Sequence, residues 1–441
     1  MNIKIVLIGA GSAAFGPATL TDLNRSEILQ GSVITLHDID EDKLNMVYEV
    51  VSEDNKRLGD KYIIEKTTDR KKALKEANFV ICSIEHGDRF KLRWQDNTIP
   101  RKYGTTEIMG ENGGPGGFFH SARQIPEILK IVDDVKKICP HAYFINYSNP
   151  LSRICLAIMQ QYPQIKMLGL CHQIELLTNK HLPKMLNKDL EKVKLIVGGL
   201  NHFAFLFGLE DLATGKNLMP EFNRKCLDYF EGKWDRFHYA DLTFEVYKRF
   251  GYFPYVGDNH LCEYVQFGSE FTKTEDIKDW ITKMEQANLG TNARLKRYHK
   301  RLKKGRYPRK GMVMGEPSGE RAIPIIEGII GDNKSYEYAV NLPNEGIIEN
   351  LSQNLVIECS AIVDSNGIHG VKLGRIPKDL AILLGREAAT QDLCIEAILQ
   401  ESKQMAINCL AMDVNCGSFE MAEKIFNEMM DLQREFLPKF K

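Results

Sequence analysis

The fold of this chain is decided by its opening stretch, Ile3-Lys-Ile-Val-Leu-Ile-Gly9-Ala-Gly11-Ser-Ala-Ala14-Phe-Gly16. It reads as a short apolar strand that runs into a glycine turn and then into a helix. Gly9 permits the tight turn, Gly11 lets the backbone approach a diphosphate, and Ala14 keeps the helix close to the strand. The helix N-terminus offers N–H groups and the positive end of its dipole to phosphate oxygens. The cofactor contacts expected in this turn are Gly9, Gly11, Ser12 and Ala13.

A second apolar run, Val33 to Leu36, leads to two acidic residues, Asp38 and Asp40. An acid at the end of the second strand can bind the ribose hydroxyls and would repel a 2′-phosphate, which favours NAD over NADP. Asp38 is the better candidate because it stands at the strand end. A glycine turn in an unrelated α/β domain is the alternative, since the bare Gly-x-Gly-x-x-Ala pattern is weak.

Three further apolar runs follow, at Phe79 to Ile84, Ala142 to Ile145 and Met167 to Leu170, with amphipathic stretches between them. Short continuous apolar runs are typical of strands buried on both faces, and strand–helix alternation predicts a parallel sheet covered by helices. In such sheets ligands bind at the carboxyl ends of the strands. We therefore expect one crevice at the nicotinamide, with Ser83 as a cofactor contact. The segments expected there are Ser83 to His86, Asn146 to Pro150 and Cys171-His172.

The pattern changes near Leu195, where a strand, a turn and a second strand precede a mostly helical remainder. The expected fold class is α/β. An N-terminal Rossmann-like, doubly wound sheet over residues 1–197 is followed by a mostly helical α+β domain over residues 198–441. The first part would bind NAD, and the second would bind the substrate and a metal.

Composition excludes several classes of protein. The chain has 441 residues, and 58 Lys and Arg against 59 Asp and Glu give a net charge of −1, so nothing predicts a nucleic-acid partner. No apolar run approaches the roughly 18 residues of a membrane helix, and the N-terminus lacks the order of a signal peptide. The ten cysteines contain no Cys-x-x-Cys pair, which is typical of reduced thiols. We expect a cytoplasmic protein.

A cysteine and two histidines are the candidate metal ligands of the chain. Cys171 and His172 end the fifth apolar run, and His202 lies in the turn after Gly198-Gly199. A thiolate and an imidazole can bind a divalent transition metal and leave positions open for substrate and water. A core thiol beside a structural histidine is the alternative on spacing alone.

Several short motifs together resemble the NAD- and manganese-dependent glycosidases of glycoside hydrolase family 4. The motifs are Gly9-Ala-Gly-Ser, Asp38-Ile-Asp, Gly113-Gly-Pro-Gly-Gly117, Asn146-Tyr-Ser-Asn149-Pro150, Gly169-Leu-Cys171-His172, Gly199-Leu-Asn201-His202 and Asn341-Leu-Pro-Asn344-Glu-Gly346. They span nearly the whole chain in the family's order. The resemblance implies a first domain like that of lactate and malate dehydrogenases. It also implies hydrolysis through NAD-dependent oxidation at carbon 3 of the sugar, elimination of the glycosidic oxygen, water addition and re-reduction.

The same resemblance implies roles for individual residues. Cys171 and His202 would be metal ligands, with manganese inherited from the family, and Asn149 would contact the sugar. The segment Phe250 to Glu263 resembles the region that holds the carbon-2 base, for which Asp258 is the first candidate and Tyr255 the second. His260 would lie beside the base and the substrate. Some members carry an aspartate after the cysteine as leaving-group acid, where this chain has His172.

The expected substrate is an α-linked hexoside or hexuronide, with α-galacturonide preferred and α-galactoside or α-glucoside as alternatives. Arg93 matches a substrate-binding arginine of the family and could bind a uronate carboxylate. Two other classes stay open, namely an NAD-dependent 2-hydroxy acid dehydrogenase and a non-catalytic NAD-binding sensor. A homo-oligomer, dimer or tetramer, is expected.

Overall fold

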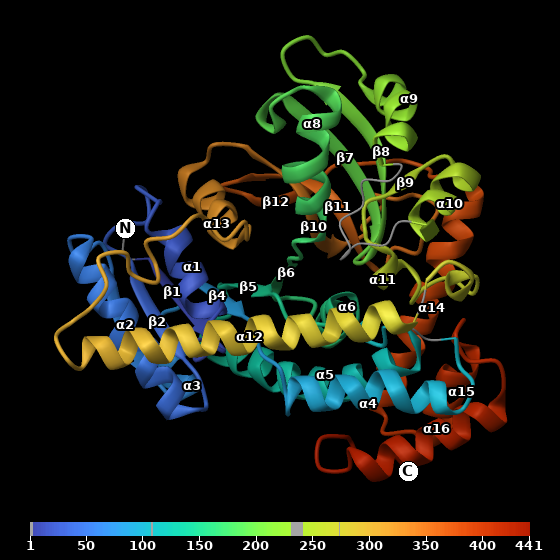
Figure 1. Cartoon of the computed structure of the whole chain (residues 1–441), viewed down its shortest axis with the longest axis horizontal. Helices are drawn as coiled ribbons and strands as arrows, with labels where there is room; N and C mark the ends of the chain where they lie inside the picture. Colours follow the sequence, from blue (N-terminus) through green and yellow to red (C-terminus); the bar gives the residue numbers. More distant parts are fainter. Residues whose placement is uncertain (1–2, 107–108, 231–240, 273) are drawn as a thin grey trace.

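The computed structural model describes residues 3–106, 109–230, 241–272 and 274–441 (Figure 1). Within these residues one mixed sheet has the strand order β3-β2-β1-β4-β5-β6-β10-β11-β7-β8-β9, and β12 pairs with β11. The strands are β1 Lys4–Ile8, β2 Val33–His37, β3 Ile63–Thr67, β4 Phe79–Cys82, β5 Tyr143–Asn146, β6 Lys166–Gly169, β7 Val193–Leu200, β8 Phe203–Asp211, β9 Phe253–Pro254, β10 Ser335–Pro343, β11 Val356–Asp364 and β12 Gly367–Gly370.

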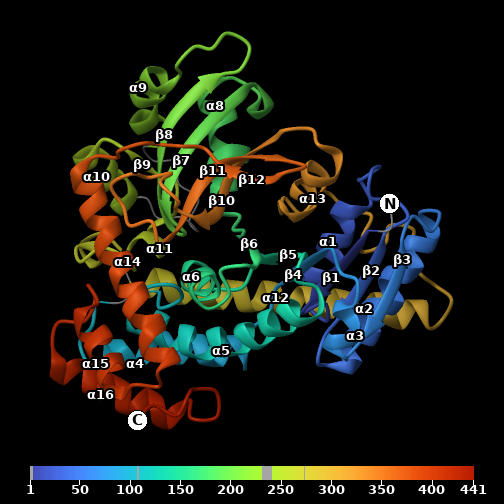
Figure 2. The ribbon, with the colours of Figure 1, turned by 180° about the vertical axis from the view of Figure 1, so that it is seen from behind.

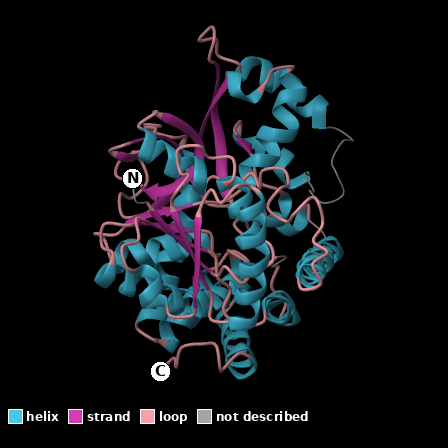
Figure 3. Ribbon diagram, turned by 90° about the vertical axis from the view of Figure 1, so that its left-hand side faces the viewer, coloured by secondary structure: helices cyan, strands magenta, loops and turns pink. Residues whose placement is uncertain are grey.

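Helices surround this sheet, as Figure 3 shows in cyan around the magenta strands. They are α1 Phe15–Leu23, α2 Glu41–Arg57, α3 Arg70–Leu74, α4 Arg89–Lys102, α5 Gly114–Ile138, α6 Leu151–Gln161, α7 Gln173–Glu175, α8 Leu182–Leu186, α9 Met219–Phe230, α10 Asp241–Phe250, α11 Asp258–Leu261, α12 Thr274–Leu302, α13 Ala322–Gly331, α14 Lys378–Leu399, α15 Lys403–Met412 and α16 Phe419–Leu432. Two apolar clusters fill the space between helices and sheet, one on each side. The α/β fold class is therefore confirmed.

The strands β3, β2, β1, β4, β5 and β6 are all parallel, as the apolar runs predicted. Ile8 pairs with His37 on one side and with Cys82 on the other, so the carboxyl ends of these strands meet at one edge. The sequence did not indicate β3, because this edge strand is largely exposed and lacks an apolar run.

The sheet continues into the second half of the chain without a break. Strand β10 pairs antiparallel with β6, and β11 joins β10 to the hairpin of β7 and β8. The expected division at residues 197/198 falls inside β7. Helices α14, α15 and α16, drawn in red, return to pack against α4, α5 and α6 of the first half (Figure 2). The two expected domains therefore share one sheet and one set of covering helices, and the division itself stays a prediction.

Helix α5 begins earlier than its apolar pattern indicates. The apolar positions recur at helical spacing from Ile125 onward, but the helix starts at Gly114, so the glycine-rich motif forms its first turn. The carboxylate of Glu263 accepts the N–H groups of Asn112 and Gly113 at this terminus. A negative charge at a helix N-terminus is stabilising, and this one comes from a residue distant in sequence. None of the helices in the described parts of the chain is long and apolar enough to cross a membrane.

Candidate active site

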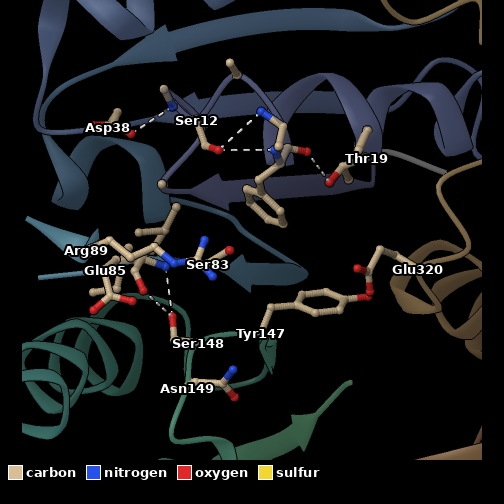
Figure 4. A pocket seen from close by; sticks show the side chains of 18 of the residues that line it. Ser12, Thr19, Asp38, Ser83, Glu85, Arg89, Tyr147, Ser148, Asn149 and Glu320 are labelled. Carbon is tan, nitrogen blue, oxygen red and sulfur yellow. Dashed lines mark hydrogen bonds between the residues drawn. The ribbon is translucent and has the colours of Figure 1, made fainter. Parts of the chain in front are cut away.

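A cavity of about 1030 Å³ opens at the carboxyl ends of the parallel strands. Figure 4 shows part of its wall, with the glycine turn at Ser12 on one side and Asn149 on the other. All three segments that the sequence predicted to share a crevice contribute to the lining, through Ser83 to His86, Ser148-Asn149 and Cys171-His172. The cavity therefore joins the dinucleotide-binding turn to the residues expected to carry out chemistry.

The glycine turn leaves no room for side chains. Gly9 has φ +89°, and a Cβ there would lie 2.0 Å from the carbonyl oxygen of Ser83. The N–H of Gly11 donates to Asp38 Oδ2 at 2.8 Å, and a Cβ on Gly11 would lie 2.7 Å from that oxygen. Asp40 instead accepts the Lys43 N–H at the start of α2. Asp38 is thus the carboxylate that faces the turn.

The predicted cofactor contacts come together around this half of the cavity. Those that line it are Gly9, Gly11, Ser12, Ala13, Asp38 and Ser83. Ser12 Oγ accepts the N–H groups of Ala14 and Phe15, each at 3.3 Å, at the start of α1. The N-terminus of α1 is therefore directed to the cavity, as phosphate binding requires.

The two predicted metal ligands face each other. Cys171 follows β6, and His202 occupies the tip of the β7–β8 hairpin, with Cys171 Sγ 3.0 Å from His202 Nε2. Ligand atoms bound to one ion at about 2.0–2.3 Å lie about 3–3.5 Å apart, so this separation fits a shared divalent ion. Among the described residues no group of three His, Cys, Asp or Glu side chains forms a metal site. The pair could thus hold an ion whose other positions are filled by substrate or water.

Burial decides the ionisation of this pair. Burial and the nearby charge of Glu358 raise the pKa of the Cys171 thiol. Burial and the neighbouring His260 lower the pKa of His202 well below its usual value. His202 is therefore neutral, the form that binds metals, whereas the thiol needs a cation to lose its proton. His202 also has φ +62°, an uncommon conformation for a residue with a side chain.

A buried carboxylate organises the residues behind the pair. Glu358 on β11 is 2% exposed and accepts hydrogen bonds from Tyr255 Oη, from Asn201 Nδ2 at 2.7 Å and from Asn341 Nδ2 at 3.0 Å. Asn201 precedes His202 in the hairpin turn, so Glu358 helps to hold that turn. The sequence reasoning missed Glu358. A lone carboxylate inside the apolar run Leu355 to Val363 was the available signal.

His260 supports the metal-ligand pair from one side. Its ring stacks on that of His202 with 4.0 Å between centroids, and its Nδ1 lies 3.3 Å from Glu263 Oε1. The other oxygen of Glu263 holds the start of α5. The structure therefore places His260 against His202, the predicted metal ligand, and neither histidine is among the residues that line the cavity.

Arg93 and Asn149 meet at a second carboxylate, Glu111. Arg93 is 4% exposed and forms an ion pair with Glu111, which also accepts a hydrogen bond from Asn149 Nδ2 at 3.3 Å. Burial alone would raise the pKa of Glu111, but the surrounding cations, Arg93 foremost among them, together outweigh burial and hold that pKa low. Glu111 and Asn149 line the cavity, whereas Arg93 does not. Arg93 therefore acts through Glu111, a residue that sequence reasoning missed.

The two candidate bases differ in their surroundings. The carboxylate of Asp258 accepts the N–H groups of Leu242 and Thr243 and the Thr243 hydroxyl, at 2.7–2.9 Å, at the start of α10. Burial raises its pKa to about 6. Tyr255 instead donates its hydroxyl to Glu358, beside Cys171. The structure thus brings Tyr255, and not Asp258, next to the metal-ligand pair.

His172, the expected leaving-group acid, is exposed at the cavity. Its Nδ1 lies 3.4 Å from Glu320 Oε1. Glu320 comes from the loop before α13 and also lines the cavity. The imidazole therefore has a carboxylate that can orient it.

The fold and this site define a class, the α/β proteins in which one cavity joins a dinucleotide-binding turn to the cysteine of a Cys–His pair. Comparison with known proteins then identifies the family. The profile described as "Family 4 glycosyl hydrolase" matches residues 4–188, and that of the "Family 4 glycosyl hydrolase C-terminal domain" matches residues 197–416. The chain belongs to family 4 of the glycosyl hydrolases, as its motifs predicted.

Two curated relatives and one solved structure align along nearly their full length. An α-glucosidase from Erwinia rhapontici is 35% identical, with 99% of each chain covered. An α-galacturonidase from Thermoanaerobacter italicus is 29% identical, with 99% of this chain and 97% of that protein covered. A 6-phospho-α-glucosidase from gut microorganisms, solved in complex with NAD and Mn²⁺, has a TM-score of 0.85 at 19% identity, with all of both chains covered. At that identity the last comparison supports the fold alone.

Proposed function

We propose that this protein hydrolyses α-linked hexosides with the help of NAD and a divalent metal ion. The observation that carries the proposal is the Cys171–His202 pair: Cys171 lines the same cavity as the glycine turn, and its Sγ lies 3.0 Å from His202 Nε2. A 2-hydroxy acid dehydrogenase would have no use for a buried thiol that faces an imidazole. A non-catalytic NAD sensor would need neither ligand.

Bound NAD⁺ would supply reversible hydride transfer at carbon 3, and a divalent ion would supply the Lewis acid that stabilises the enediolate. The residues of the chain would do the rest. Cys171 and His202 would hold the metal, and Asn149 with Glu111 would orient the sugar hydroxyls. His172, oriented by Glu320, would donate a proton to the departing glycosidic oxygen. The manganese preference comes from the family and from the relative solved with Mn²⁺.

We favour Tyr255 over Asp258 as the base that removes the carbon-2 proton. Three hydrogen bonds already occupy the Asp258 carboxylate at the start of α10. The Tyr255 hydroxyl lies beside Cys171 and donates to Glu358, a carboxylate that can hold the phenol in place. Replacement Tyr255→Phe should lower kcat/KM by about 10²- to 10⁴-fold, the usual contribution of a general base. An unchanged kcat/KM in Tyr255→Phe would instead favour Asp258 as the base that removes the carbon-2 proton.

For the sugar we favour a neutral α-hexoside, with α-glucoside first. The described lining of the cavity includes seven Asp or Glu and three Lys or Arg side chains, and this excess of acids disfavours an anionic substrate. The relative from Erwinia rhapontici is an α-glucosidase. α-Galactoside is the nearest alternative. α-Galacturonide, the preference from sequence, finds support in the relative from Thermoanaerobacter italicus.

The decisive experiment offers aryl α-glucoside, α-galactoside and α-galacturonide to the full chain with NAD⁺, Mn²⁺ and a thiol reductant in D₂O. Elimination predicts deuterium at carbon 2 of the released sugar and a requirement for both cofactors. Net NADH production without hydrolysis would support the dehydrogenase, and NAD binding without turnover would support the sensor. Hydrolysis that survives chelator and NAD removal, without deuterium, would overturn the mechanism.

The cytoplasmic location and the homo-oligomeric state stay predictions. Light scattering would measure the mass of the protein in solution and so test the oligomeric state.

A further inference from the structure

Arg89 is a cation that lines the cavity and forms no direct ion pair with the described residues. It is the first residue of α4 and lines the cavity. Its Nε is buried and has no hydrogen-bond partner, and its side chain forms no ion pair with the described residues. Its guanidinium lies 5.7 Å from the centroid of the Phe90 ring. Burial and the charge of Arg93 lower its pKa, and Glu111 and Glu85 act in the opposite direction. Arginine is rarely buried without a partner, so this side chain is available for a ligand.

The carboxylates near Arg89 are held by other residues. Glu85 accepts hydrogen bonds from His120 Nε2 at 3.1 Å and from Gln124 Nε2 at 2.6 Å. Glu111 is paired with Arg93 and bound by Asn149. Each of these acids therefore has a hydrogen-bond partner of its own, and they attract the guanidinium of Arg89 without a direct ion pair.

The start of α4 lies beside Arg89 at the cavity, and the Asp88 carboxylate offsets part of its helix dipole. Asp88 caps the helix by accepting the Lys91 N–H at 3.2 Å, and the preceding residues His86 and Gly87 line the cavity. The N-terminus of a helix carries partial positive charge that favours anions. In Figure 4 the Arg89 side chain extends toward Ser83, between the glycine turn at Ser12 and Asn149. The cation therefore lies between the dinucleotide turn and the sugar-binding end.

We propose that Arg89 and the N-terminus of α4 form an anion-binding site for phosphate or carboxylate oxygens of the ligands in this cavity. A guanidinium binds such oxygens in bidentate fashion. Two ligands could supply them, the diphosphate of the dinucleotide or an acidic group on the sugar. The diphosphate is the favoured source because the carbonyl of Ser83 lies beside Gly9, at the glycine turn. This inference rests on the proposed function for the identity of the cofactor and the sugar.

The test measures binding of NAD⁺, ADP and AMP to the full chain by calorimetry, for wild type, Arg89→Met and Arg89→Lys. Loss of a charge-assisted contact to the diphosphate should raise the Kd of NAD⁺ and ADP about tenfold to a hundredfold, and that of AMP less. The Kd values of the Arg89→Lys variant should lie between those of the wild type and those of Arg89→Met. Lys91→Met, an exposed change on the same helix, serves as the matched control and should leave all three values unchanged.

Thermal unfolding separates a ligand contact from a structural role. Removal of an unpaired, partly buried charge should leave the Tm of the ligand-free protein unchanged or higher, while the rise in Tm caused by NAD⁺ should shrink. A lower ligand-free Tm with an unchanged Kd for NAD⁺ would overturn the proposal in favour of a structural role.

Kinetics identify the source of the anion. If the Kd values of NAD⁺ and ADP are unchanged in Arg89→Met and only the KM for α-galacturonide rises, Arg89 binds the sugar carboxylate. This result would also support the proposed anion-binding site. If neither changes, the proposal is wrong. The binding arm needs no turnover, so a wild-type protein that binds NAD⁺ through Arg89 but cleaves no glycoside would refute the proposed function and leave this site intact.

Discussion

The two ends of the cavity are built in different ways. At the dinucleotide end, Gly9, Gly11, Asp38 and Ser83 follow three adjacent parallel strands, so the pairing of β1 with β2 and β4 brings them together. At the metal end, Cys171 follows β6, while its neighbours come from a hairpin tip, a buried loop and β11.

Because of this difference, the two ends of the cavity should be sensitive to different kinds of substitution. The dinucleotide end depends on close backbone approach, so added atoms should damage it. The metal end depends on hydrogen bonds among distant segments, so loss of a ligand or of a buried acceptor should damage it. The predictions below test this contrast, from the largest expected effect to the smallest.

Replacement Cys171→Ser should abolish metal-dependent activity, with kcat/KM lower by about a thousandfold or more, because a second-layer residue alone is worth about tenfold to a hundredfold. Mn²⁺ binding, followed by the paramagnetic resonance of the free ion, should weaken in parallel. Cys139→Ser is the matched control, since Cys139 is a buried thiol at the end of α5. Full metal binding by the Cys171 variant would contradict the assignment.

Replacement Gly9→Ala should weaken NAD⁺ binding by about a hundredfold, because the added Cβ would lie 2.0 Å from the Ser83 carbonyl and would hold a strained φ. Gly31→Ala is the control. Gly31 has a similar φ of +84° with nothing within 4 Å of the added atom, so only the local strain should appear, as a loss of about 1 kcal/mol in stability. Equal effects of the two variants on NAD⁺ affinity would show that strain, and not crowding, matters at the turn.

Replacement Glu358→Gln should lower Mn²⁺ affinity and kcat about tenfold to a hundredfold, since Asn201 and Tyr255 would lose a charged acceptor. Glu387→Gln, at another buried glutamate that pairs with Arg153 at 3.6 Å, is the control and should keep metal affinity. Unchanged metal binding and kcat in the Glu358 variant would limit Glu358 to a structural role.

Replacement Asp258→Asn should have the smallest effect on catalysis. An amide matches the N–H donors at the start of α10 less well than a carboxylate, so the free energy of unfolding should fall by about 1–2 kcal/mol. The kcat/KM of the folded enzyme should stay within about twofold of wild type. Denaturant titration and steady-state kinetics measure the two quantities, and a loss of a hundredfold or more in kcat/KM would restore Asp258 as the base.

Much of the dinucleotide end could be predicted from the sequence. The strand–turn–helix pattern around Gly9, the acid after the second strand and the residues after each apolar run all lie where expected. The hairpin turn at Asn201-His202 was also predicted, because two strand-like runs flank it. These features depend on local patterns and on the rule that parallel strands end at one edge.

The partners of charged side chains could not be predicted in the same way. Arg93, the predicted substrate-binding arginine, forms an ion pair with Glu111, while Arg89, four residues earlier, lines the cavity. Both lie on the same face of α4, one turn apart, and their position along the helix decides which one lines the cavity. Glu358 and Glu263 act on residues far away in sequence, and no spacing rule connects such pairs.

The sequence by itself determined the family, the doubly wound sheet and the identity of the dinucleotide turn, because each follows from short-range pattern and steric necessity. The tertiary structure alone decided which carboxylates neutralise which cations, which candidate base stands beside Cys171, and which arginine lines the cavity without a direct ion pair. The physical reason is that charge compensation in a buried site depends on distances across the sheet, and those distances exist only after the strands and helices have packed.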